Sequence, residues 1–256
     1  FCATGGKPFD NTQPSILFIH GASFDHTTWK LQARYFAWNG CSVLAVDLPG
    51  HGLSDGPPLD SIQEMANWVE SLLNAAAINQ TAIVGHSMGA QIAMDFTSRF
   101  NDRVYAMALL GAAIKIPVNS ALLDPAAVND HVAFDLLNSW GYGRRAQLGG
   151  HRMPGLWFMR GGLRVMERSA KGVLHKDLVA TNNYSGENST TKISCPTLII
   201  TGEKDMMTPL PAGISLAKKI GGSKHITLPN LGHIMMEEDP DATLDALREF
   251  LFPLHS

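Results

Sequence analysis

The chain has 256 residues, a length that suits one large α/β domain or a core with a modest insertion. Hydrophobic residues make up 45% of the sequence and charged residues 17%, and no window approaches the roughly 18 unbroken apolar residues that a membrane helix needs. The net charge of -3 and the scattered Lys and Arg residues give no basis for binding nucleic acid or an anionic membrane, so we expect neither as a partner.

The three cysteines, Cys2, Cys41 and Cys195, are an odd number without short spacing, so they fit neither a disulfide framework nor a zinc site. This pattern favours a reducing compartment, and we expect a cytoplasmic protein. The residues shown carry no signal-peptide pattern. Residues 1–6 look like the end of a strand entering a turn, so we expect that residues before Phe1 have been cleaved or omitted.

Short apolar runs alternate with helical patterns in the first half of the chain, in the βαβ rhythm of a parallel sheet. A capping box of Ser61 and Glu64 marks the start of the second helix. The expected strands are 15–19, 42–46, 81–84 and 104–110, and the expected helices are 28–38, 61–77 and 89–100.

The rhythm fails between Lys115 and Thr191, where glycines and prolines break up short helical pieces rich in Trp, Met and Leu. A structureless loop of this length is improbable in a compact domain. We therefore interpret residues 115–191 as a helical cap inserted after the sheet's sixth strand, with residues 1–114 and 192–256 forming the core. The rhythm then resumes with strands 197–201 and 224–228 and helices 209–220 and 240–252, and Thr208 and Asp239, each followed by proline, are predicted as N-caps of these helices.

A serine lies where the strand 81–84 turns sharply into the next helix, within Gly85-His86-Ser87-Met88-Gly89-Ala90. This is the setting of a nucleophile elbow. A serine nucleophile needs a histidine to take its proton and a carboxylate to hold that histidine. Asp205 and His233 each follow a later strand, and the carboxyl ends of parallel strands meet at one edge of the sheet. The order along the chain is Ser87, Asp205, His233.

With these residues in place, the chain resembles the α/β-hydrolase superfamily over nearly its whole length. The resemblance implies a mostly parallel sheet flanked by helices, with a helical cap, and Ser87 as nucleophile, His233 as general base and acid, and Asp205 as the orienting carboxylate. The matching segments are Phe18-Ile19-His20-Gly21-Ala22, Asp47-Leu48-Pro49-Gly50-His51-Gly52-Leu53-Ser54, Gly85 to Ala90, Thr201 to Asp205 and Leu231-Gly232-His233.

The resemblance also implies an oxyanion hole made of two backbone N–H groups. One belongs to Met88, the residue after the nucleophile, at the start of a helix. The second comes from the loop after His20-Gly21, where Ala22 is the first choice and Ser23 the alternative. For the substrate pocket we select Phe24, Trp140, Trp157 and Phe158, although Trp-rich and Met-rich stretches are more often the core of a cap.

Several residues have plainer interpretations. Ser87 could be a helix N-cap, and His233 a loop histidine bonded to backbone. Glu203 and Asp239 compete with Asp205 as the orienting carboxylate. We interpret His20 and His86 as structural, and residues 47–54 as a supporting turn, because this segment lacks the lysine and spacing of a phosphate-binding loop.

The predicted function is therefore a serine hydrolase that cleaves a carboxylic ester, thioester or lactone through an acyl-enzyme, with a small acyl compound as its expected partner. A carbon–carbon bond hydrolase acting on a dioxo acid, or a perhydrolase, would use the same triad. A non-catalytic ligand-binding protein of the same fold is the alternative from another class. We expect no cofactor and no metal, because no His, Cys or acidic cluster has the spacing of a metal site.

Overall fold

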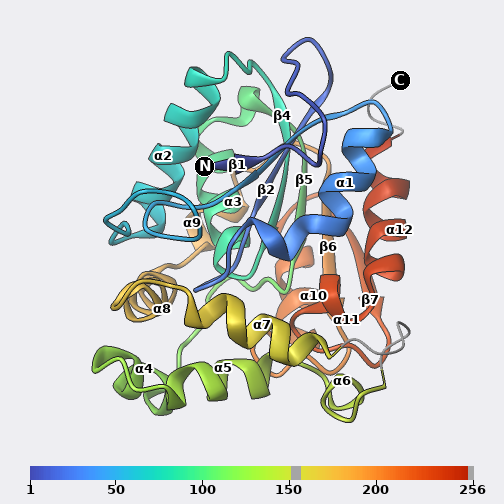
Figure 1. Ribbon diagram of the computed structural model, residues 1–256. Helices are drawn as coiled ribbons and strands as arrows, with labels where there is room; N and C mark the ends of the chain where they lie inside the picture. Colours follow the sequence, from blue (N-terminus) through green and yellow to red (C-terminus); the bar gives the residue numbers. More distant parts are fainter. Residues whose placement is uncertain (151–156, 253–256) are drawn as a thin grey trace.

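A computed structural model describes residues 1–150 and 157–252. These residues form one sheet of seven strands in the order β1-β3-β2-β4-β5-β6-β7 (Figure 1). Every neighbouring pair is parallel except β1 with β3, which is antiparallel. The strands are β1 (Cys2–Ala3), β2 (Ser15–Ile19), β3 (Ser42–Val46), β4 (Thr81–His86), β5 (Val104–Leu110), β6 (Thr197–Gly202) and β7 (Lys224–Leu228).

Helices cover both faces of the sheet, which is why its central strands are apolar without alternation. In β2, Ile16 and Phe18 face the buried cluster that holds α1 and α12, whereas Leu17 and Ile19 face the cluster of α2, α3 and α10. The helices of the two layers are α1 (Lys30–Trp38), which follows the 3-10 helix η1 (His26–Trp29), α2 (Ile62–Ala75), α3 (Met88–Arg99), α10 (Leu210–Lys219) and α12 (Pro240–Leu251). The short helices η2 (Asn101–Arg103) and α11 (Met235–Glu238) complete this part.

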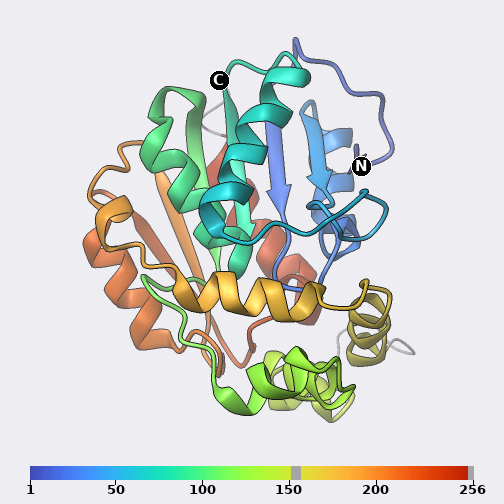
Figure 2. The same ribbon diagram turned by 90° about the vertical axis from the view of Figure 1, so that its left-hand side faces the viewer.

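The chain between β5 and β6 is helical, and residues 151–156 of it lie outside the described residues. Helices α4, α5, α7 and α8 lie beyond the carboxyl ends of the parallel strands (Figures 1 and 2), and α9 contacts α3. We call residues 115–191 the helical insertion. The insertion follows the fifth strand of the chain, whereas the sequence pattern placed it after a sixth, so the predicted number of strands before it is too high by one. Its helices are α4 (Ser120–Ala127), α5 (Val132–Gly141), α6 (Arg144–Gln147), α7 (Phe158–Glu167), α8 (Val173–Asn183) and α9 (Glu187–Thr190).

The predicted helix starts are confirmed at two of three caps. Ser61 accepts a hydrogen bond from the Glu64 N–H over 3.2 Å, and Asp239 accepts one from the Ala242 N–H over 3.1 Å. Thr208 is not the N-cap of α10, which begins two residues later at Leu210. The hydroxyl of Thr208 instead donates to Asp205 Oδ2 over 2.7 Å, because this buried carboxylate competes for it.

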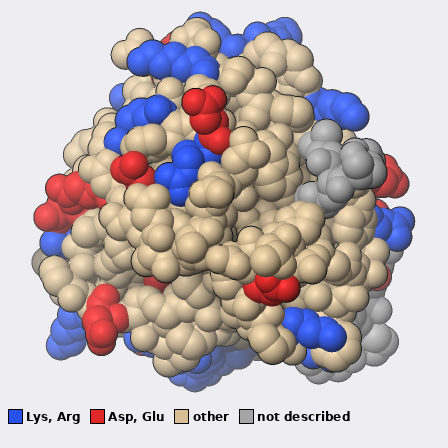
Figure 3. Space-filling view, turned by 90° about the horizontal axis from the view of Figure 1, so that it is seen from above, with Lys and Arg blue, Asp and Glu red and all other residues tan. Residues whose placement is uncertain are grey.

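The exposed surface carries charges of both signs. In the view from above, opposite the helical insertion, Lys and Arg side chains are interspersed with Asp and Glu on a largely uncharged face (Figure 3). Among the described helices, none combines the length and the apolar character that crossing a membrane requires.

Candidate active site

Ser87 occupies a strained turn between β4 and α3. Its φ of 54° and ψ of -115° lie outside the regions that non-glycine residues ordinarily adopt. The turn requires glycine on both sides, because a Cβ at Gly85 would lie 2.3 Å from the Gly89 carbonyl oxygen, and a Cβ at Gly89 would lie 2.3 Å from the Ile19 carbonyl oxygen. Ser87 is the N-cap residue of α3 by position, but its side chain makes no capping hydrogen bond, so its hydroxyl is not used as a helix cap.

His233 and Asp205 form a buried pair, with His233 Nδ1 2.8 Å from Asp205 Oδ2. The loop after β6 satisfies the carboxylate further: the N–H groups of Met207 and Thr208 each donate to Oδ1 over 2.8 Å. Burial raises the pKa of Asp205, but the neighbouring His233 and the hydrogen bonds from Thr208 outweigh it, so the pKa lies below its usual value of 3.8. Asp205 is therefore ionised at neutral pH.

The competing carboxylates lie elsewhere. Glu203 is exposed and accepts a hydrogen bond from the Asn230 N–H, while Asp239 caps α12. The carboxylate hydrogen-bonded to His233 Nδ1 is that of Asp205, so the geometry favours Asp205 as its partner.

His233 is held on three sides. Its backbone N–H donates to the Gly141 carbonyl over 2.7 Å, its carbonyl accepts from His86 Nε2 over 3.0 Å, and its Nδ1 faces Asp205. The remaining ring nitrogen, Nε2, has no hydrogen-bond partner among the described residues. His233 and Ser87 line the same cavity.

His20 and His86 are buried and bonded to backbone, as their structural interpretation predicts. His20 Nδ1 donates to the Gly21 carbonyl and its Nε2 accepts from the Leu48 N–H. Burial, reinforced by a neighbouring histidine, lowers the pKa of His20 to about 4 and that of His86 to about 3. Both rings are neutral supports of the loops around Ser87 and His233.

The two candidates for the second oxyanion donor differ in their hydrogen bonding. The N–H of Ser23 donates to Asp177 Oδ2 over 2.8 Å and is therefore engaged away from the cavity. Ala22 lines the cavity beside Ser87. Met88 is the first residue of α3, and the first N–H groups of a helix have no intrahelical acceptor. The geometry thus favours Ala22 over Ser23, together with Met88.

Two buried carboxylates near the site were not predicted. Asp177, in α8, accepts from Ser23 and also from His51 Nε2, over 2.8 Å. Burial alone would lower the pKa of His51, but the charge and hydrogen bond of Asp177, together with the Pro49 carbonyl and the charge of Asp47, outweigh it, and the pKa is raised. The loop after His20 is thus tied to the helical insertion.

Glu238, in α11, is the second. Its two carboxylate oxygens accept hydrogen bonds from the N–H groups of Gly232 and Gly143, each over 3.0 Å. Burial raises the pKa of Glu238 to about 7 despite these bonds. The only sequence signal for this buried carboxylate was the presence of acidic residues among apolar ones just after His233. Glu238 joins the loop that carries His233 to the insertion.

A cavity of about 540 Å³ opens between the carboxyl ends of the strands and the helical insertion. Phe24 and Trp140 line it, as predicted. Trp157 does not line it and is 59% exposed, and Phe158 is buried in the apolar cluster that also contains Tyr142. These two selections are corrected: α7 begins at Phe158, and its ring packs in the core. The other lining residues are Gly21, Ala22, His86, Ser87, Ile116, Pro117, Val118, Asn119, Leu122, Leu137, Leu178, Thr181, Met206, Met207, Pro209, His233 and Ile234.

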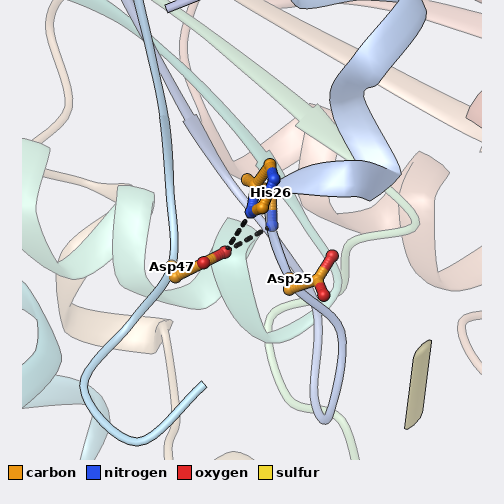
Figure 4. Close-up of side chains that lie close together, drawn as sticks. All are labelled: Asp25, His26 and Asp47. Carbon is orange, nitrogen blue, oxygen red and sulfur yellow. Dashed lines mark hydrogen bonds and ion pairs between the residues drawn. The ribbon is translucent and has the colours of Figure 1, made fainter. Parts of the chain in front are cut away.

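In the described part of the chain, one group of residues has ligand atoms close enough to hold a metal ion: Asp25, His26 and Asp47 (Figure 4). Protein donors already occupy these atoms. His26 donates through both its backbone N–H and Nδ1 to Asp47 Oδ1, and Arg168 donates to Asp25 Oδ2 over 2.6 Å. The cluster therefore fits a joint between loops better than a metal centre.

Comparison with known proteins identifies the family. The model of the alpha/beta hydrolase family matches residues 16–246. The chain belongs to this family. Among its relatives, the (E)-2-((N-methylformamido)methylene)succinate hydrolase of Acinetobacter baylyi is 24% identical, covering 92% of this chain and 89% of the relative. The monoacylglycerol lipase ABHD6 of Bos taurus is 25% identical, covering 98% and 78%.

Solved structures of α/β-hydrolases share the same fold. A thermophilic esterase superimposes with a TM-score of 0.78 at 27% sequence identity, over 93% of this chain and 90% of that one. The relatives of this α/β-hydrolase thus include esterase, lipase and other hydrolase activities, and the substrate differs among them.

Proposed function

We propose that the protein is a serine hydrolase that cleaves uncharged carboxylic esters through an acyl-enzyme. One observation carries the proposal: the ionised Asp205 holds His233 by Nδ1, His233 Nε2 has no hydrogen-bond partner among the described residues, and His233 lines the same cavity as the strained Ser87. This is the arrangement in which a serine hydroxyl can lose its proton as it attacks a carbonyl.

The mechanism follows from these positions. Ser87 Oγ attacks the ester carbonyl carbon as His233 Nε2 takes the serine proton, and Asp205 stabilises the resulting imidazolium. The tetrahedral oxyanion accepts hydrogen bonds from the N–H groups of Met88 and Ala22. His233 then protonates the departing alcohol, which leaves an acyl group on Ser87. In the second half, His233 deprotonates a water that attacks this acyl group, and the acid leaves with Ser87 restored.

The wall of the cavity favours an uncharged substrate. Its described lining contains no Lys, Arg, Asp or Glu, and its two histidines are His233 and the neutral His86. Burying a substrate carboxylate there without a partner would be costly. This supports esters, and equally neutral thioesters or lactones, over the dioxo acids of carbon–carbon bond hydrolases. The volume lies within the range of small-molecule sites.

Covalent labelling with a fluorophosphonate tests this proposal. We expect the wild-type protein to be labelled at one residue and to hydrolyse p-nitrophenyl esters. Ser87→Ala should abolish both, whereas Ser71→Ala, on the exposed side of α2, should change neither. An unlabelled wild-type protein, or equal labelling of Ser87→Ala, would contradict the mechanism and favour the ligand-binding alternative.

A further inference from the structure

Two backbone N–H groups of the loop that carries His233 donate to one carbonyl of the helical insertion. The N–H groups of His233 and Ile234 both reach the carbonyl of Gly141, the last residue of α5, over 2.7 Å and 3.3 Å. The same helix lines the cavity through Leu137 and Trp140. Helix α5 is therefore bound directly to the backbone of the candidate general base.

The Glu238 side chain makes a second connection between the same two segments. Its Oε1 accepts a hydrogen bond from the N–H of Gly232, and its Oε2 accepts one from the N–H of Gly143, each over 3.0 Å. Gly232 precedes His233, and Gly143 lies two residues beyond Gly141. Only 6% of Glu238 is exposed, so water has little access to replace these two bonds.

The loop of His233 is packed tightly between the insertion and the end of a strand. A Cβ at Gly232 would lie 2.3 Å from the Gly143 nitrogen, and a Cβ at Gly202, at the end of β6, would lie 2.1 Å from the Gly232 carbonyl oxygen. Close-packed segments transmit displacements to one another. A shift of residues 141–143 would therefore shift the backbone next to His233.

The preceding carboxylate, Glu237, makes a different connection. It is also buried in α11, at 8% exposed, and it accepts a hydrogen bond from the hydroxyl of Tyr142. Among the described residues, the hydrogen bonds of these two carboxylates diverge: that of Glu237 leads to the insertion alone, whereas those of Glu238 lead to the insertion and to the loop of His233.

We propose that Glu238 is a positioning residue for the reaction: by accepting from Gly232 and Gly143 together, it holds His233 where Nε2 can take the proton of the serine. This inference rests on the proposed ester hydrolysis at Ser87. A general base must lie within hydrogen-bond reach of the proton it removes, and a misplacement of about 1 Å can cost about 10²-fold in rate. The helical insertion thus takes part in catalysis as well as in the shape of the cavity.

Alanine variants of the two neighbouring carboxylates test the inference. Glu238→Ala removes the acceptor of both N–H groups, whereas Glu237→Ala removes a buried carboxylate of the same helix and leaves the bonds to the loop of His233 in place. For each we would measure kcat and KM with p-nitrophenyl butyrate, the rate of fluorophosphonate labelling and the melting temperature. The assays are run at pH 8, because burial raises the pKa of Glu238 to about 7 and the carboxylate is ionised above it.

We expect Glu238→Ala to lower kcat and the labelling rate by about 10- to 100-fold, with a change in KM of less than about twofold. Glu237→Ala should change kcat by less than about twofold, although the loss of a buried hydrogen bond lowers the melting temperature of both variants. A residue with a structural role alone would lower the melting temperature and leave the kcat of the folded protein unchanged.

Glu238→Gln keeps the inference testable if Glu238→Ala does not fold. Glutamine has one side-chain oxygen, so it can accept from one of the two N–H groups and presents its own NH₂ to the other. We expect a smaller loss of kcat than in Glu238→Ala, again with KM largely unchanged. A Glu238→Gln protein with the kcat of the wild-type protein would overturn the proposal.

The failure of this inference and that of the proposed function give different results. If the wild-type protein turns over no ester and Ser87 is not labelled, the proposed function itself is wrong. If the wild-type protein hydrolyses esters but Glu238→Ala and Glu237→Ala have the same kcat, or the effect of Glu238→Ala falls on KM, the positioning role of Glu238 is overturned.

Discussion

The carboxylate of Asp177 accepts a hydrogen bond from the N–H of Ser23, which lies 154 residues earlier in the chain. The same oxygen accepts from His51 Nε2. One side chain of the helical insertion thus fixes the loop that also presents Ala22 to the cavity. Because the pair of Asp177 and His51 is fully buried, its loss should affect both the stability of the fold and the geometry of the candidate active site.

Asp177→Ala should lower the free energy of unfolding by about 3 kcal/mol, because it leaves His51 and the Ser23 N–H without their acceptor. It should also lower kcat more than it raises KM, if the Ala22 N–H binds the oxyanion in the transition state as proposed. Lys176→Ala removes the neighbouring surface ion pair with Asp60 and should cost less than about 1 kcal/mol. If Asp177→Ala and Lys176→Ala had equal effects on the free energy of unfolding in urea and on the rate of ester hydrolysis, this role of Asp177 would be contradicted.

Asp205→Asn should reduce kcat about 10⁴-fold, because an amide at this position favours the wrong tautomer of His233. Steady-state hydrolysis of p-nitrophenyl esters measures the loss. Glu203→Gln, two residues away and exposed, is the matched control and should retain activity. Activity preserved in Asp205→Asn would mean that another carboxylate orients the imidazole.

Thr208→Val should also weaken the pair of Asp205 and His233, with a smaller loss of kcat than Asp205→Asn. It removes the hydroxyl that donates to Asp205 Oδ2 and keeps the backbone N–H that donates to Oδ1. A hydrogen bond to a charged group is worth about 1.5–3 kcal/mol, so we expect a loss of roughly tenfold or more in kcat. Thr208→Ser should restore most of it, and a serine variant as impaired as the valine variant would argue against the hydroxyl.

Gly85→Ala should destabilise the protein by about 3 kcal/mol or prevent its folding, since the added Cβ would overlap backbone atoms of the nucleophile turn. Gly161→Ala is the opposite case. Gly161 lies within α7, and a Cβ there meets no atom within 4 Å, so this variant should gain about 0.5–1 kcal/mol. Thermal unfolding of both variants checks the contrast, and a stable, active Gly85→Ala protein would show that the turn can relax.

Glu238 predicts a particular dependence of stability on pH. Its pKa rises from 4.5 to about 7 on folding, so between these values the folded protein holds a proton that the unfolded chain has lost. The free energy of unfolding should therefore fall as the pH rises through this window, by an amount on the order of 3 kcal/mol. Urea denaturation at pH 5 and pH 8 should show this fall in the wild-type protein and less of it in Glu238→Gln. Identical pH dependence in both would contradict the prediction.

The sequence predicted the core because its signals are local. Apolar runs of strand length, the glycines around Ser87 and the residues after β6 and β7 each mark a strand end, and the parallel sheet brings these ends together. Asp205 and His233 could be paired for that reason. Thr208 was misassigned because a threonine before proline usually caps a helix, and the pattern cannot register competition from a carboxylate three residues earlier.

The helical insertion was harder to predict. Its helices are short and interrupted, so which face of each is buried depends on neighbours far along the chain. Asp177 resembles any charged residue of a surface helix until α8 is placed over the loop after His20. The same holds for Trp157 and Phe158, whose aromatic character suggested that they line a substrate pocket. Of the three residues selected in the insertion, only Trp140 lines the cavity.

Helix α8 carries Asp177 and Thr181 one turn apart, so a single helix both holds the loop of the candidate oxyanion donor and forms part of the cavity wall. Exchange of the insertion between related enzymes would therefore change the support of the loop after His20 as well as the substrate selectivity. A chimaera that received residues 115–191 from another hydrolase would lose the acceptor for Ser23 and His51 unless the donor supplied one. Engineering of new substrate ranges in this protein should therefore exchange α8 and residues 21–25 together.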